Sequence, residues 1–489
     1  MPITLGQLLA GIVLVTSAQD REIMGITQDS RRVEPGFLFI AVPGMASDGR
    51  QYIGQAIDHG GAAIIAEAGG EQVSFQGTPI FWVHGLAAHI GLIADRFFGE
   101  PSKRLTIVGI TGTNGKTTCA HLLAQALNRG QRRCAVLGTV GNGFPGTLRP
   151  STHTTLDPVT LHSVLSELVR EGATDVCMEV SSHALAQDRV AGLAFAGAVF
   201  TNLTRDHLDY HGSMDAYAQA KARLFEGDTL RYAVLNTDDP YGAVLKEHID
   251  ARGVPTLGFG SSTGDVRVLD AAGTTDGLAV RLQTPRGIIT ARTRFFGRFN
   301  ALNLAAVVAA LLLDDVTPFT EIEAILSQAD PVPGRMERFG GNGRPLVVID
   351  YAHTPDALDK ALRALREHTR GRLWCVFGCG GNRDAGKRPE MGRIAERLSD
   401  GIVLTDDNPR RESGDLIIAN ILQGMHDRSH PVRVVRDRRE AISAALGSAT
   451  ADDVVLVAGK GHEQYQEIGE KRLPFSDQEC VRTLLEACP

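Results

Sequence analysis

The stretch RLTIVGITGTNGKTTCAHLLAQAL, residues 104–127, joins a β-branched run to a helical pattern through a glycine-rich turn. Gly112 and Gly115 lie in the turn, and Lys116 and Thr117 open the helix. Backbone N–H groups around such a turn, together with the positive end of the helix dipole, favour a bound anion. We therefore predict a phosphate-binding loop, in which Lys116 adds a point charge and Thr117 can coordinate Mg²⁺. A turn that only connects a strand to a helix is the alternative interpretation.

The spacing of the loop differs from the common pattern GxxxxGK[ST]. That pattern places a glycine at position 110, where this chain has Ile110, and Gly109 gives a spacing of five residues instead of four. The difference indicates a subclass of phosphate-loop proteins rather than the kinases or GTPases in general. The loop alone does not decide between a kinase, a motor, a regulatory ATPase and a ligase.

Short apolar runs alternate with helix-length segments on both sides of the loop. The runs are FLFIAV, AAIIAE and PIFWVH before the loop, CAVLGTV, DVCMEV, GAVFTNL and YAVLNTDD after it, and PLVVIDYA, RLWCVFG, GIVLTDD, VRVVRD and DVVLVAG toward the C-terminus. This alternation predicts parallel sheets with crossover helices. Residues 265–297 instead predict short antiparallel strands, and residues 301–313 predict an apolar helix.

Two proline- and glycine-containing segments, GEPSKR and ADPVPGR, interrupt the alternation and indicate domain boundaries. We therefore predict an α/β protein of three domains. Residues 1–102 would form a smaller α/β domain, residues 103–333 a central phosphate-loop domain around a parallel sheet, and residues 334–489 a Rossmann-like α/β domain.

The composition is typical of a globular protein with several domains. The chain has 489 residues, of which 43% are hydrophobic and 22% charged, and its formal net charge is -7. The negative balance argues against nucleic acid or an anionic membrane as the main partner. Seven scattered cysteines without paired CxxC spacing predict reduced thiols and a cytoplasmic location. The apolar N-terminus lacks a basic segment, and the longest apolar run is too short to span a membrane, so no membrane insertion is expected.

A set of ordered motifs carries a resemblance to a known family. The motifs are GITGTNGKTT, MEVSSHAL, TNLTRDHLDYHG, AKARLF, FNALN, GRMER, DYAHTPDAL and AGKGHE. In this order they resemble the Mur ligases, which extend the peptide of the cell-wall precursor, and the match covers nearly the whole chain. The N-terminal stretch DSRRVEPGFLFIAVPG is similar to the nucleotide-sugar module of those enzymes.

The resemblance implies an ATP-dependent amide ligase of peptidoglycan synthesis. Within the family, the chain looks most like the enzyme that adds the third peptide residue to UDP-N-acetylmuramoyl-L-alanyl-D-glutamate. ATP would phosphorylate a carboxylate, and an amine would then attack the acyl phosphate. Because two anions meet in the first step, cations must offset their repulsion.

The resemblance also assigns the nucleotide and metal residues. The ATP contacts would be Gly112, Thr113, Asn114, Gly115, Lys116, Thr117, Thr118, Asn300, Arg335 and Asp350. The catalytic group would be Lys116, Glu179, His207 and Lys221, and the Mg²⁺ ligands would be Thr117, Glu179, His207 and Lys221, the last as a CO₂-derived carbamate (N6-carboxylysine). Glu179 lies at the end of the run DVCMEV, and the carboxyl end of a parallel strand is where α/β sites lie. The alternative interpretations are a helix cap or ion-pair partner for Glu179, a surface histidine for His207 and, as the default from the pattern alone, a solvated lysine for Lys221.

The positions that match the UDP-sugar contacts of the family are polar. They are Ser30, Thr154, Thr155, Ser181, Gln187 and Arg189. Hydroxyl and amide groups orient such a ligand, and the arginine can pair with an anionic group. His153 stands where the family pattern has asparagine. Taken one at a time, these residues would be ordinary hydrogen-bonding residues of loops.

The stretch TDDNPRRES, residues 405–413, concerns the amino acid that is added. The family's enzymes for meso-2,6-diaminopimelate carry DNPR, and the matching contacts here are Arg383, Asp407, Asn408, Pro409, Arg410, Gly459 and Glu463. Diaminopimelate has a distal carboxylate that lysine lacks. The guanidinium of Arg410 would pair with this carboxylate and repel a lone ammonium. Arg411 is expected to be a solvated charge.

Three other functions stay open on the sequence. The chain could add L-lysine instead of diaminopimelate, or it could be a folylpolyglutamate-type ligase with a similar ATP loop. A nucleotide-binding regulator without catalysis is the third alternative. Intact Lys116, Glu179, His207 and Lys221 argue against the regulator.

Overall fold

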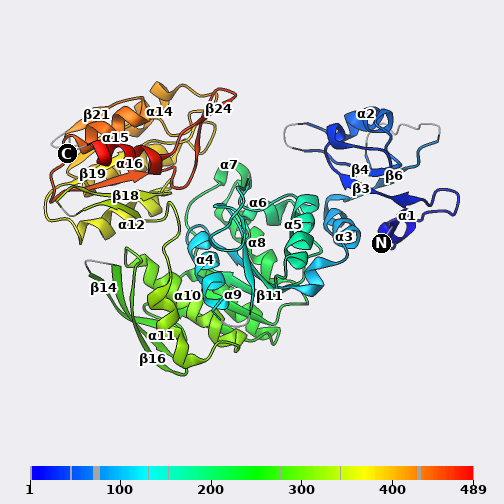
Figure 1. The fold of residues 1–489 in the computed structure, drawn as a ribbon, viewed down its shortest axis with the longest axis horizontal. Helices are drawn as coiled ribbons and strands as arrows, with labels where there is room; N and C mark the ends of the chain where they lie inside the picture. The colour runs from blue at the N-terminus through cyan, green and yellow to red at the C-terminus, as the bar shows by residue number, and fades with distance from the viewer. Residues whose placement is uncertain are drawn as a thin grey trace. The chain divides into compact units, whose positions relative to one another are not determined.

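The computed structural model describes residues 3–44, 47–69, 77–129, 132–151, 153–274, 277–341, 343–426 and 431–487. The helices and strands are labelled along the ribbon in Figure 1. The chain forms two compact units. Unit 1 contains Met1–Thr111, Gln131–Ala198 and Ala220–Arg231, and unit 2 contains Gly112–Gly130, Val199–Gln219 and Tyr232–Pro489. No helix in the described part of the chain is long and apolar enough to cross a membrane.

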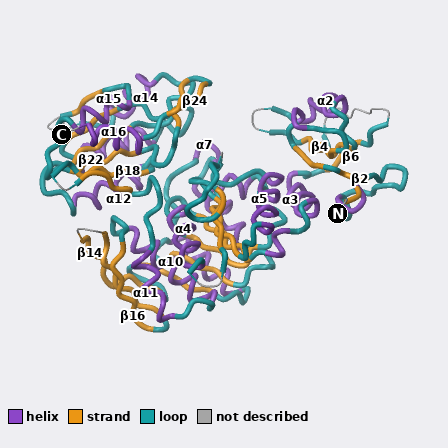
Figure 2. The backbone as a smooth tube through the Cα atoms, viewed as in Figure 1, coloured by secondary structure: helices purple, strands orange, loops and turns teal. Residues whose placement is uncertain are grey.

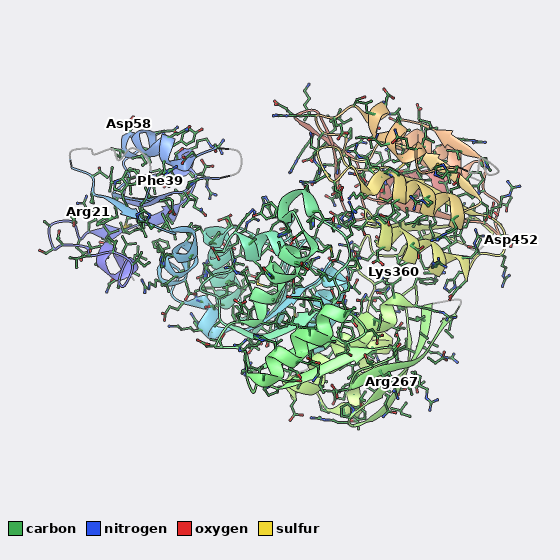
Figure 3. All side chains as sticks on the ribbon, turned by 180° about the vertical axis from the view of Figure 1, so that it is seen from behind. Arg21, Phe39, Asp58, Arg267, Lys360 and Asp452 are labelled. Carbon is green, nitrogen blue, oxygen red and sulfur yellow. The ribbon has the colours of Figure 1, made fainter. Side chains whose placement is uncertain are left out.

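Unit 1 begins with a parallel sheet of order β3-β4-β5-β6. Its strands are β3 (Gly25–Thr27), β4 (Phe37–Ala41), β5 (Ala63–Glu67) and β6 (Ile80–Val83), and its helices are α2 (Ile53–Asp58) and α3 (Ala87–Phe97). On one face, Phe39 packs with Ile53 and Ala56 of α2 (Figure 3). On the other face, Ile40 packs with Ile90 and Ile93 of α3. The strands predicted from the runs FLFIAV, AAIIAE and PIFWVH are confirmed as β4, β5 and β6.

The remainder of unit 1 holds a second sheet, in which β7, β10 and β8 run parallel and β9 pairs antiparallel with β8. Its elements are β7 (Thr106–Thr111), β8 (Cys134–Leu137), β9 (Asn142–Gly143), α5 (Pro158–Arg170), β10 (Asp175–Glu179) and α6 (Ser182–Ala186). Smaller elements are β1 (Ile3–Thr4), α1 (Leu5–Leu8), β2 (Glu22–Ile23) and the 3₁₀ turns η1 (Ser30–Arg32), η2 (Gly49–Tyr52), η3 (Pro101–Arg104) and η4 (Arg223–Phe225). Helix α5 starts where sequence signals place it, because Asp157 caps the N–H of Thr160 and Pro158 occupies the first turn.

Unit 2 contains the helix of the phosphate loop and an antiparallel ribbon (Figure 2). Its first elements are α4 (Lys116–Leu127), α7 (Leu208–His211), β12 (Tyr232–Asn236), α9 (Pro240–Ala251), β13 (Thr256–Gly260), β14 (Val266–Thr274), β15 (Gly277–Thr284), β16 (Gly287–Thr293), α10 (Phe299–Asp314) and α11 (Phe319–Gln328). Strand β11 (Phe195–Phe200) and helix α8 (Met214–Ala222) contain residues of both units. Antiparallel β14–β16 and helix α10 confirm the predictions for residues 265–297 and 301–313.

The last part of unit 2 is built on a sheet of order β17-β18-β22-β19-β20-β21. All pairs are parallel except β17 with β18. The strands are β17 (Glu337–Gly340), β18 (Leu346–Asp350), β19 (Leu373–Phe377), β20 (Gly401–Leu404), β21 (Val432–Val434) and β22 (Val454–Ala458), followed by the hairpin β23 (Tyr465–Ile468) and β24 (Lys471–Pro474). The helices are α12 (Pro355–Arg366), α13 (Lys387–Leu398), α14 (Gly414–Leu422), α15 (Arg438–Leu446) and α16 (Asp477–Ala487).

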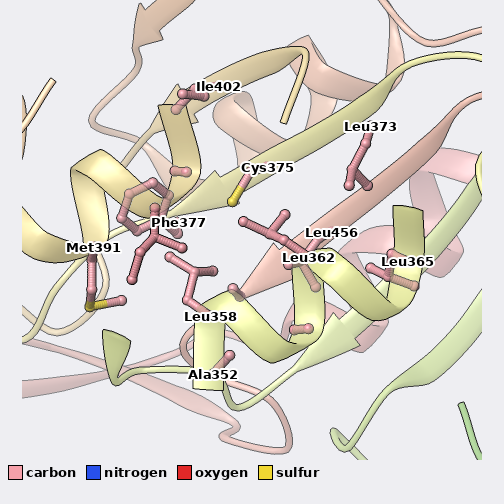
Figure 4. Packing of buried hydrophobic residues seen from close by; sticks show 14 of the residues in the cluster. Ala352, Leu358, Leu362, Leu365, Leu373, Cys375, Phe377, Met391, Ile402 and Leu456 are labelled. Atoms are coloured by element: carbon pink, nitrogen blue, oxygen red, sulfur yellow. The ribbon is translucent and has the colours of Figure 1, made fainter. Parts of the chain in front are cut away.

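Helices cover both faces of this sheet. Residues of α12, α13 and α14 share a buried cluster with β19, whereas residues of α15 and α16 pack with the other face. Leu358, Leu362 and Leu365 of α12 lie against Leu373 and Phe377 of β19 (Figure 4). The spacing of the three leucines puts them on one face of the helix, so the apolar stripe of the sequence fixes which side of α12 is buried.

A buried ion pair joins α15 to α16. The side chains of Arg438 and Asp477 are both 0% exposed. Arg438 Nε donates to Asp477 Oδ1 at 2.8 Å and Nη2 donates to Oδ2 at 2.7 Å. Nη2 also donates to the carbonyl of Ala458, the last residue of β22. The pair therefore ties the two helices to the sheet edge.

Replacing Asp477 with asparagine should destabilise this part of the protein strongly. The change leaves the Arg438 charge buried without a counter-charge, which costs about 3–5 kcal/mol of unfolding free energy. The matched control is Glu470→Gln, which removes a surface pair with Arg411 whose side chains are 72% and 78% exposed, and costs about 0–1 kcal/mol. Scanning calorimetry of both variants measures the effect, and equal melting temperatures would contradict the structural role of the buried pair.

Candidate functional site

The predicted phosphate loop is a tight turn that requires glycine at two positions. Gly112 has φ 145° and Gly115 has φ 88°. A Cβ atom on Gly112 would lie 1.9 Å from Thr201 Oγ1, and one on Gly115 would lie 2.5 Å from Asn303 Oδ1. Both the backbone conformation and the lack of space therefore exclude a side chain there.

The shape of the loop is held by the segment TNLTRDHLDYHG. The N–H of Thr113 donates to the carbonyl of Asn202 at 2.8 Å, and the N–H of Asn114 donates to Asn202 Oδ1 at 2.9 Å. Thr201 Oγ1 donates to the carbonyl of Asn114 at 2.6 Å. Thr113 Oγ1 lies 3.2 Å from the hydroxyl of Tyr217. Two motifs that are distant in the sequence thus form one structure.

Lys116 points back over the loop. Its Nζ donates to the carbonyl of Gly112 at 2.8 Å and to that of Thr113 at 2.9 Å. Helix α4 starts at Lys116, so the N–H groups of its first turn have no earlier helical carbonyl to bind. An ammonium group, these N–H groups and the positive helix end together favour a phosphate at this turn.

Arg335, from the motif GRMER, contacts the first turn of the helix that follows the loop. Arg335 Nη2 donates to Thr117 Oγ1 at 2.9 Å, and its guanidinium lies 4.4 Å from the ring centroid of Tyr351. Asp350, at the end of β18, accepts the N–H of Met336 at 2.8 Å. Burial raises the pKa of Asp350, although the nearby charge of Arg335 opposes this. Thr117 and Arg335, both predicted ATP residues, are therefore in contact.

Asn303 is a site residue that the sequence reasoning missed. Its Nδ2 donates to Asn300 Oδ1 at 2.8 Å, and Asn300 Nδ2 donates to the carbonyl of Phe296 at 2.7 Å. A Cβ atom on Gly115 would lie 2.5 Å from Asn303 Oδ1, so Asn303 packs against the phosphate loop. The predicted residue Asn300 is hydrogen-bonded to Asn303. Two asparagines at i and i+3 on an otherwise apolar helix were the available signal.

Glu179 ends strand β10 in unit 1, as predicted. It is 1% exposed, and its carboxylate accepts the N–H of Thr139 at 2.8 Å and the hydroxyl of Thr139 at 3.1 Å. A Cβ on Gly138 would lie 2.2 Å from Glu179 Oε1, so this glycine makes room for the acid. The carboxyl end of a parallel strand is where ligands bind in α/β sheets.

Five of the predicted UDP-sugar residues belong to one hydrogen-bonded group with Thr139 and Glu179. Thr139 Oγ1 lies 3.1 Å from Thr154 Oγ1, Thr155 Oγ1 donates to the carbonyl of Glu179, the N–H of Ser181 donates to Thr155 Oγ1, and Arg189 donates to the carbonyl of Thr155 and to Gln187 Oε1. Ser30 belongs to a different hydrogen-bond set, in which its Oγ donates to Gln55 Oε1 at 2.8 Å. His153 is exposed, and its carbonyl accepts the hydroxyl of Ser151 at 2.7 Å. The ligand contacts of these residues stay predictions.

The other predicted metal residues lie in different surroundings. His207 in unit 2 has φ 54°, and its Nε2 lies 3.3 Å from Asp206 Oδ2. Burial would raise the pKa of Asp206, but the charges of His207, His353 and Lys387 lower it below the usual value. Lys221 in unit 1 is 1% exposed, so the alternative of a solvated surface lysine is wrong. Each unit therefore holds part of the predicted set, with Glu179 and Lys221 in unit 1 and Thr117 and His207 in unit 2.

The donor set can be compared with what Mg²⁺ requires. Among the described residues, no three His, Cys, Asp or Glu side chains are grouped closely enough to hold a metal ion. Mg²⁺ is commonly bound through one or two carboxylates together with water and substrate phosphates. A carboxylate such as Glu179 and a hydroxyl such as Thr117 fit this pattern chemically.

Two of the predicted amino-acid residues, Asn408 and Glu463, form a hydrogen-bonded group with Lys460 after β20 and β22. Asn408 Nδ2 donates to Glu463 Oε2 at 2.9 Å. Lys460 Nζ donates to Asn408 Oδ1 at 3.0 Å and to Glu463 Oε2 at 2.7 Å. Burial raises the pKa of Glu463, and the ammonium of Lys460 opposes the shift. Lys460, 0% exposed and missed by the sequence reasoning, lies inside the motif AGKGHE.

Glycines give the neighbouring side chains room. A Cβ on Gly459 would lie 2.3 Å from Asp407 Oδ2, and one on Gly380 would lie 2.9 Å from Arg410 Nη1. A Cβ on Gly381 would lie 1.9 Å from the carbonyl oxygen of Pro409. Close packing of the loops after β19, β20 and β22 therefore depends on these glycines.

Two arginines of this region, Arg383 and Arg411, are exposed. Arg383 lies in the loop after β19. Arg411 forms a surface ion pair with Glu470 at 2.6 Å, and its side chain is 72% exposed. The prediction that Arg411 is a solvated charge is confirmed.

Three family models match successive parts of the chain. Residues 22–97 match the model "Mur ligase family, catalytic domain", residues 110–311 match "Mur ligase middle domain", and residues 334–461 match "Mur ligase, glutamate ligase domain". The chain therefore belongs to the Mur ligase family. It has the family's three-domain α/β fold with a parallel central sheet.

Two of the similar proteins carry the same name. A UDP-N-acetylmuramoyl-L-alanyl-D-glutamate--2,6-diaminopimelate ligase from Pseudomonas aeruginosa is 48% identical over 488 residues, which cover 100% of this chain and 99% of the relative. A solved structure of a ligase with the same name is 35% identical with a TM-score of 0.72, covering 100% of this chain and 99% of that one. A Mycobacterium tuberculosis folylpolyglutamate synthase structure, 18% identical with a TM-score of 0.64, covers 76% of this chain and 92% of that one, and shares the fold.

Gly115→Ala should weaken nucleotide binding, because the new Cβ must displace Asn303 or the loop. Such overpacking costs about 1–3 kcal/mol, or roughly tenfold to hundredfold in affinity. Gly146→Ala is a matched control, since Gly146 has φ 89°, close to the 88° of Gly115, and nothing lies within 4 Å of its Cβ position. Titration calorimetry with ADP measures both variants, and equal affinities would show that the contact with Asn303 does not shape the site.

Proposed function

We propose that this protein uses ATP to join meso-2,6-diaminopimelate to the D-glutamate of UDP-N-acetylmuramoyl-L-alanyl-D-glutamate, a step of peptidoglycan precursor synthesis. The observation that carries the proposal is the 48% identity over the full chain to a ligase of this name. The hydrogen-bonded group around Asn408 and Glu463, with Arg410 beside it, supports the choice of amino acid.

The reaction needs an activated carboxylate. The γ-phosphoryl group of ATP moves to the carboxylate oxygen, which breaks the bond to ADP and forms an acyl phosphate. The amine nitrogen of the incoming amino acid then attacks the acyl carbon, loses a proton, and expels inorganic phosphate as the amide forms. Lys116 and Arg335 carry the positive charges that offset repulsion between carboxylate and phosphates.

Mg²⁺ would neutralise phosphate charge in this reaction, held by Thr117, Glu179, His207 and Lys221. Lys221 would act as a carbamate formed with CO₂, which replaces a cation with an anion. Its burial supports this role, because a lysine that is 1% exposed gains little solvation as an ammonium. Thr117 and Glu179 contribute the oxygen donors that the ion prefers.

The other substrates would be divided among three domains. Residues 1–102 with Ser30, and the group Thr154, Thr155, Ser181, Gln187 and Arg189, would bind the UDP-sugar. Residues 103–333 would bind ATP, and residues 334–489 would bind the amino acid. We place the enzyme in the cytoplasm, because the reaction consumes ATP.

The assay that tests the proposal is phosphate release by the purified protein. With ATP, Mg²⁺ and UDP-N-acetylmuramoyl-L-alanyl-D-glutamate present, we expect rapid release with meso-diaminopimelate and little with L-lysine. Mass spectrometry of the tripeptide product confirms which amino acid was joined. Turnover with lysine alone would overturn the specificity, and release with folate and glutamate would favour a folylpolyglutamate-type ligase.

Arg410→Ala should remove the preference for diaminopimelate. A hydrogen bond to a charged group contributes about 1.5–3 kcal/mol, so KM for diaminopimelate should rise about 10- to 100-fold while KM for ATP changes little. The adjacent Arg411→Ala is the control, because that side chain pairs only at the surface with Glu470 and should leave selectivity unchanged. Unchanged kinetics in the Arg410 variant would exclude the residue as the reader of the distal carboxylate.

A further inference from the structure

The backbone of Arg410 is fixed by the hairpin β23–β24. Arg410 has φ 53°, a left-handed conformation that residues other than glycine adopt uncommonly. Its N–H donates to the carbonyl of Glu467 at 3.0 Å, and its carbonyl accepts the N–H of Gly469 at 2.7 Å. These two bonds hold the strained residue against the hairpin.

The side chain of Arg410 is held by the same hairpin. Its Nε donates to Glu467 Oε2 at 2.8 Å, and its Nη1 donates to the carbonyl of Gly381 at 3.0 Å. Within the described residues, Nη2 has no hydrogen-bond partner. The edge of the guanidinium that contains Nε is therefore occupied, and the end formed by Nη1 and Nη2 can receive a carboxylate.

Glu467 is an anion at neutral pH. Burial would raise its pKa, but the hydrogen bond from Arg472 and the charges of Arg410 and Arg472 lower it below the usual value. Arg472 Nε donates to Glu467 Oε1 at 2.9 Å, so each carboxylate oxygen accepts one arginine. Two guanidinium groups and one carboxylate leave a net positive charge, which still attracts a carboxylate ligand.

We propose that Glu467 is a positioning residue that sets the selectivity for an amino acid with a distal carboxylate, by holding Arg410 with its Nη1 and Nη2 end exposed to the ligand. The inference rests on the proposed function, in which Arg410 binds that carboxylate. Because Glu467 contacts Arg410 through both its backbone carbonyl and its side chain, it restrains a long side chain that would otherwise turn among several rotamers.

The test compares Glu467→Gln with the unaltered enzyme in the phosphate-release assay. Glutamine keeps the size of the side chain but loses the charge, so the bond from Arg410 weakens. We expect KM for diaminopimelate to rise about tenfold, and selectivity over lysine to fall in proportion, while KM for ATP stays within about twofold. Glu467→Asp keeps the charge on a shorter side chain and should retain more selectivity than Glu467→Gln.

Two controls separate positioning from a general structural effect. Glu470→Gln changes another acid of the same hairpin, 78% exposed and paired with Arg411, and should behave as the unaltered enzyme. In an Arg410→Ala background, Glu467→Gln should cause no further loss of selectivity, because the residue acts through Arg410.

Each outcome decides the proposal. Retained selectivity in Glu467→Gln, a KM for ATP that rises as much as that for diaminopimelate, or a further loss in the Arg410→Ala background would overturn the positioning role alone. A preference of the unaltered enzyme for lysine would overturn both the positioning role and the proposed function. A loss confined to diaminopimelate and dependent on Arg410 would establish the role.

Discussion

The candidate site depends on the direction of the strands. Parallel strands must all be joined by crossovers, so their carboxyl ends meet at one edge of the sheet, where the connecting loops start. In the C-terminal sheet, this edge carries Asp350 at the end of β18, Gly380 after β19, Asp407 after β20 and Gly459 after β22. Residues separated by more than a hundred positions in the chain are thereby neighbours. A substitution that altered strand order would separate the amino-acid residues even if every one of them were kept.

The sequence was sufficient where a property is local. The alternation of apolar runs predicted the strands, and the apolar run at residues 301–313 predicted helix α10. Contacts between motifs could not be predicted from these local patterns. Asn303 and Lys460 stand inside quoted motifs, yet their roles depend on which loop faces them in three dimensions. The importance of Glu467 was invisible for the same reason, because its contact with Arg410 depends on pairing between a loop and a hairpin.

Buried charges in the C-terminal region are arranged in compensated groups. Arg438 pairs with Asp477, Arg388 with Glu412, and Lys460 with Glu463, and each of these cations is at most 1% exposed. An isolated charge at such positions would be costly, so each pair stabilises mainly by preventing that penalty. The Lys460–Glu463 pair adds a chemical consequence. Lys460 opposes the effect of burial on the pKa of Glu463. Glu463 Oε2 accepts hydrogen bonds from both Lys460 Nζ and Asn408 Nδ2, and within the described residues no hydrogen bond reaches Oε1, which in the proposed function would accept a ligand ammonium.

Selectivity between diaminopimelate and lysine requires orientation as well as charge. A mobile guanidinium in a solvated loop would attract any carboxylate and would pay its rotamer entropy on each binding event. Holding Nε with Glu467 and Nη1 with Gly381 removes most of that freedom before the ligand arrives. Glu467, the acid that orients Arg410, also lowers the local positive charge. It therefore weakens the attraction for a carboxylate ligand while it fixes the geometry of the guanidinium. In the proposed role of Arg410, a ligand with only a distal ammonium would meet a cation that cannot turn away from it, and this fixed repulsion would disfavour lysine.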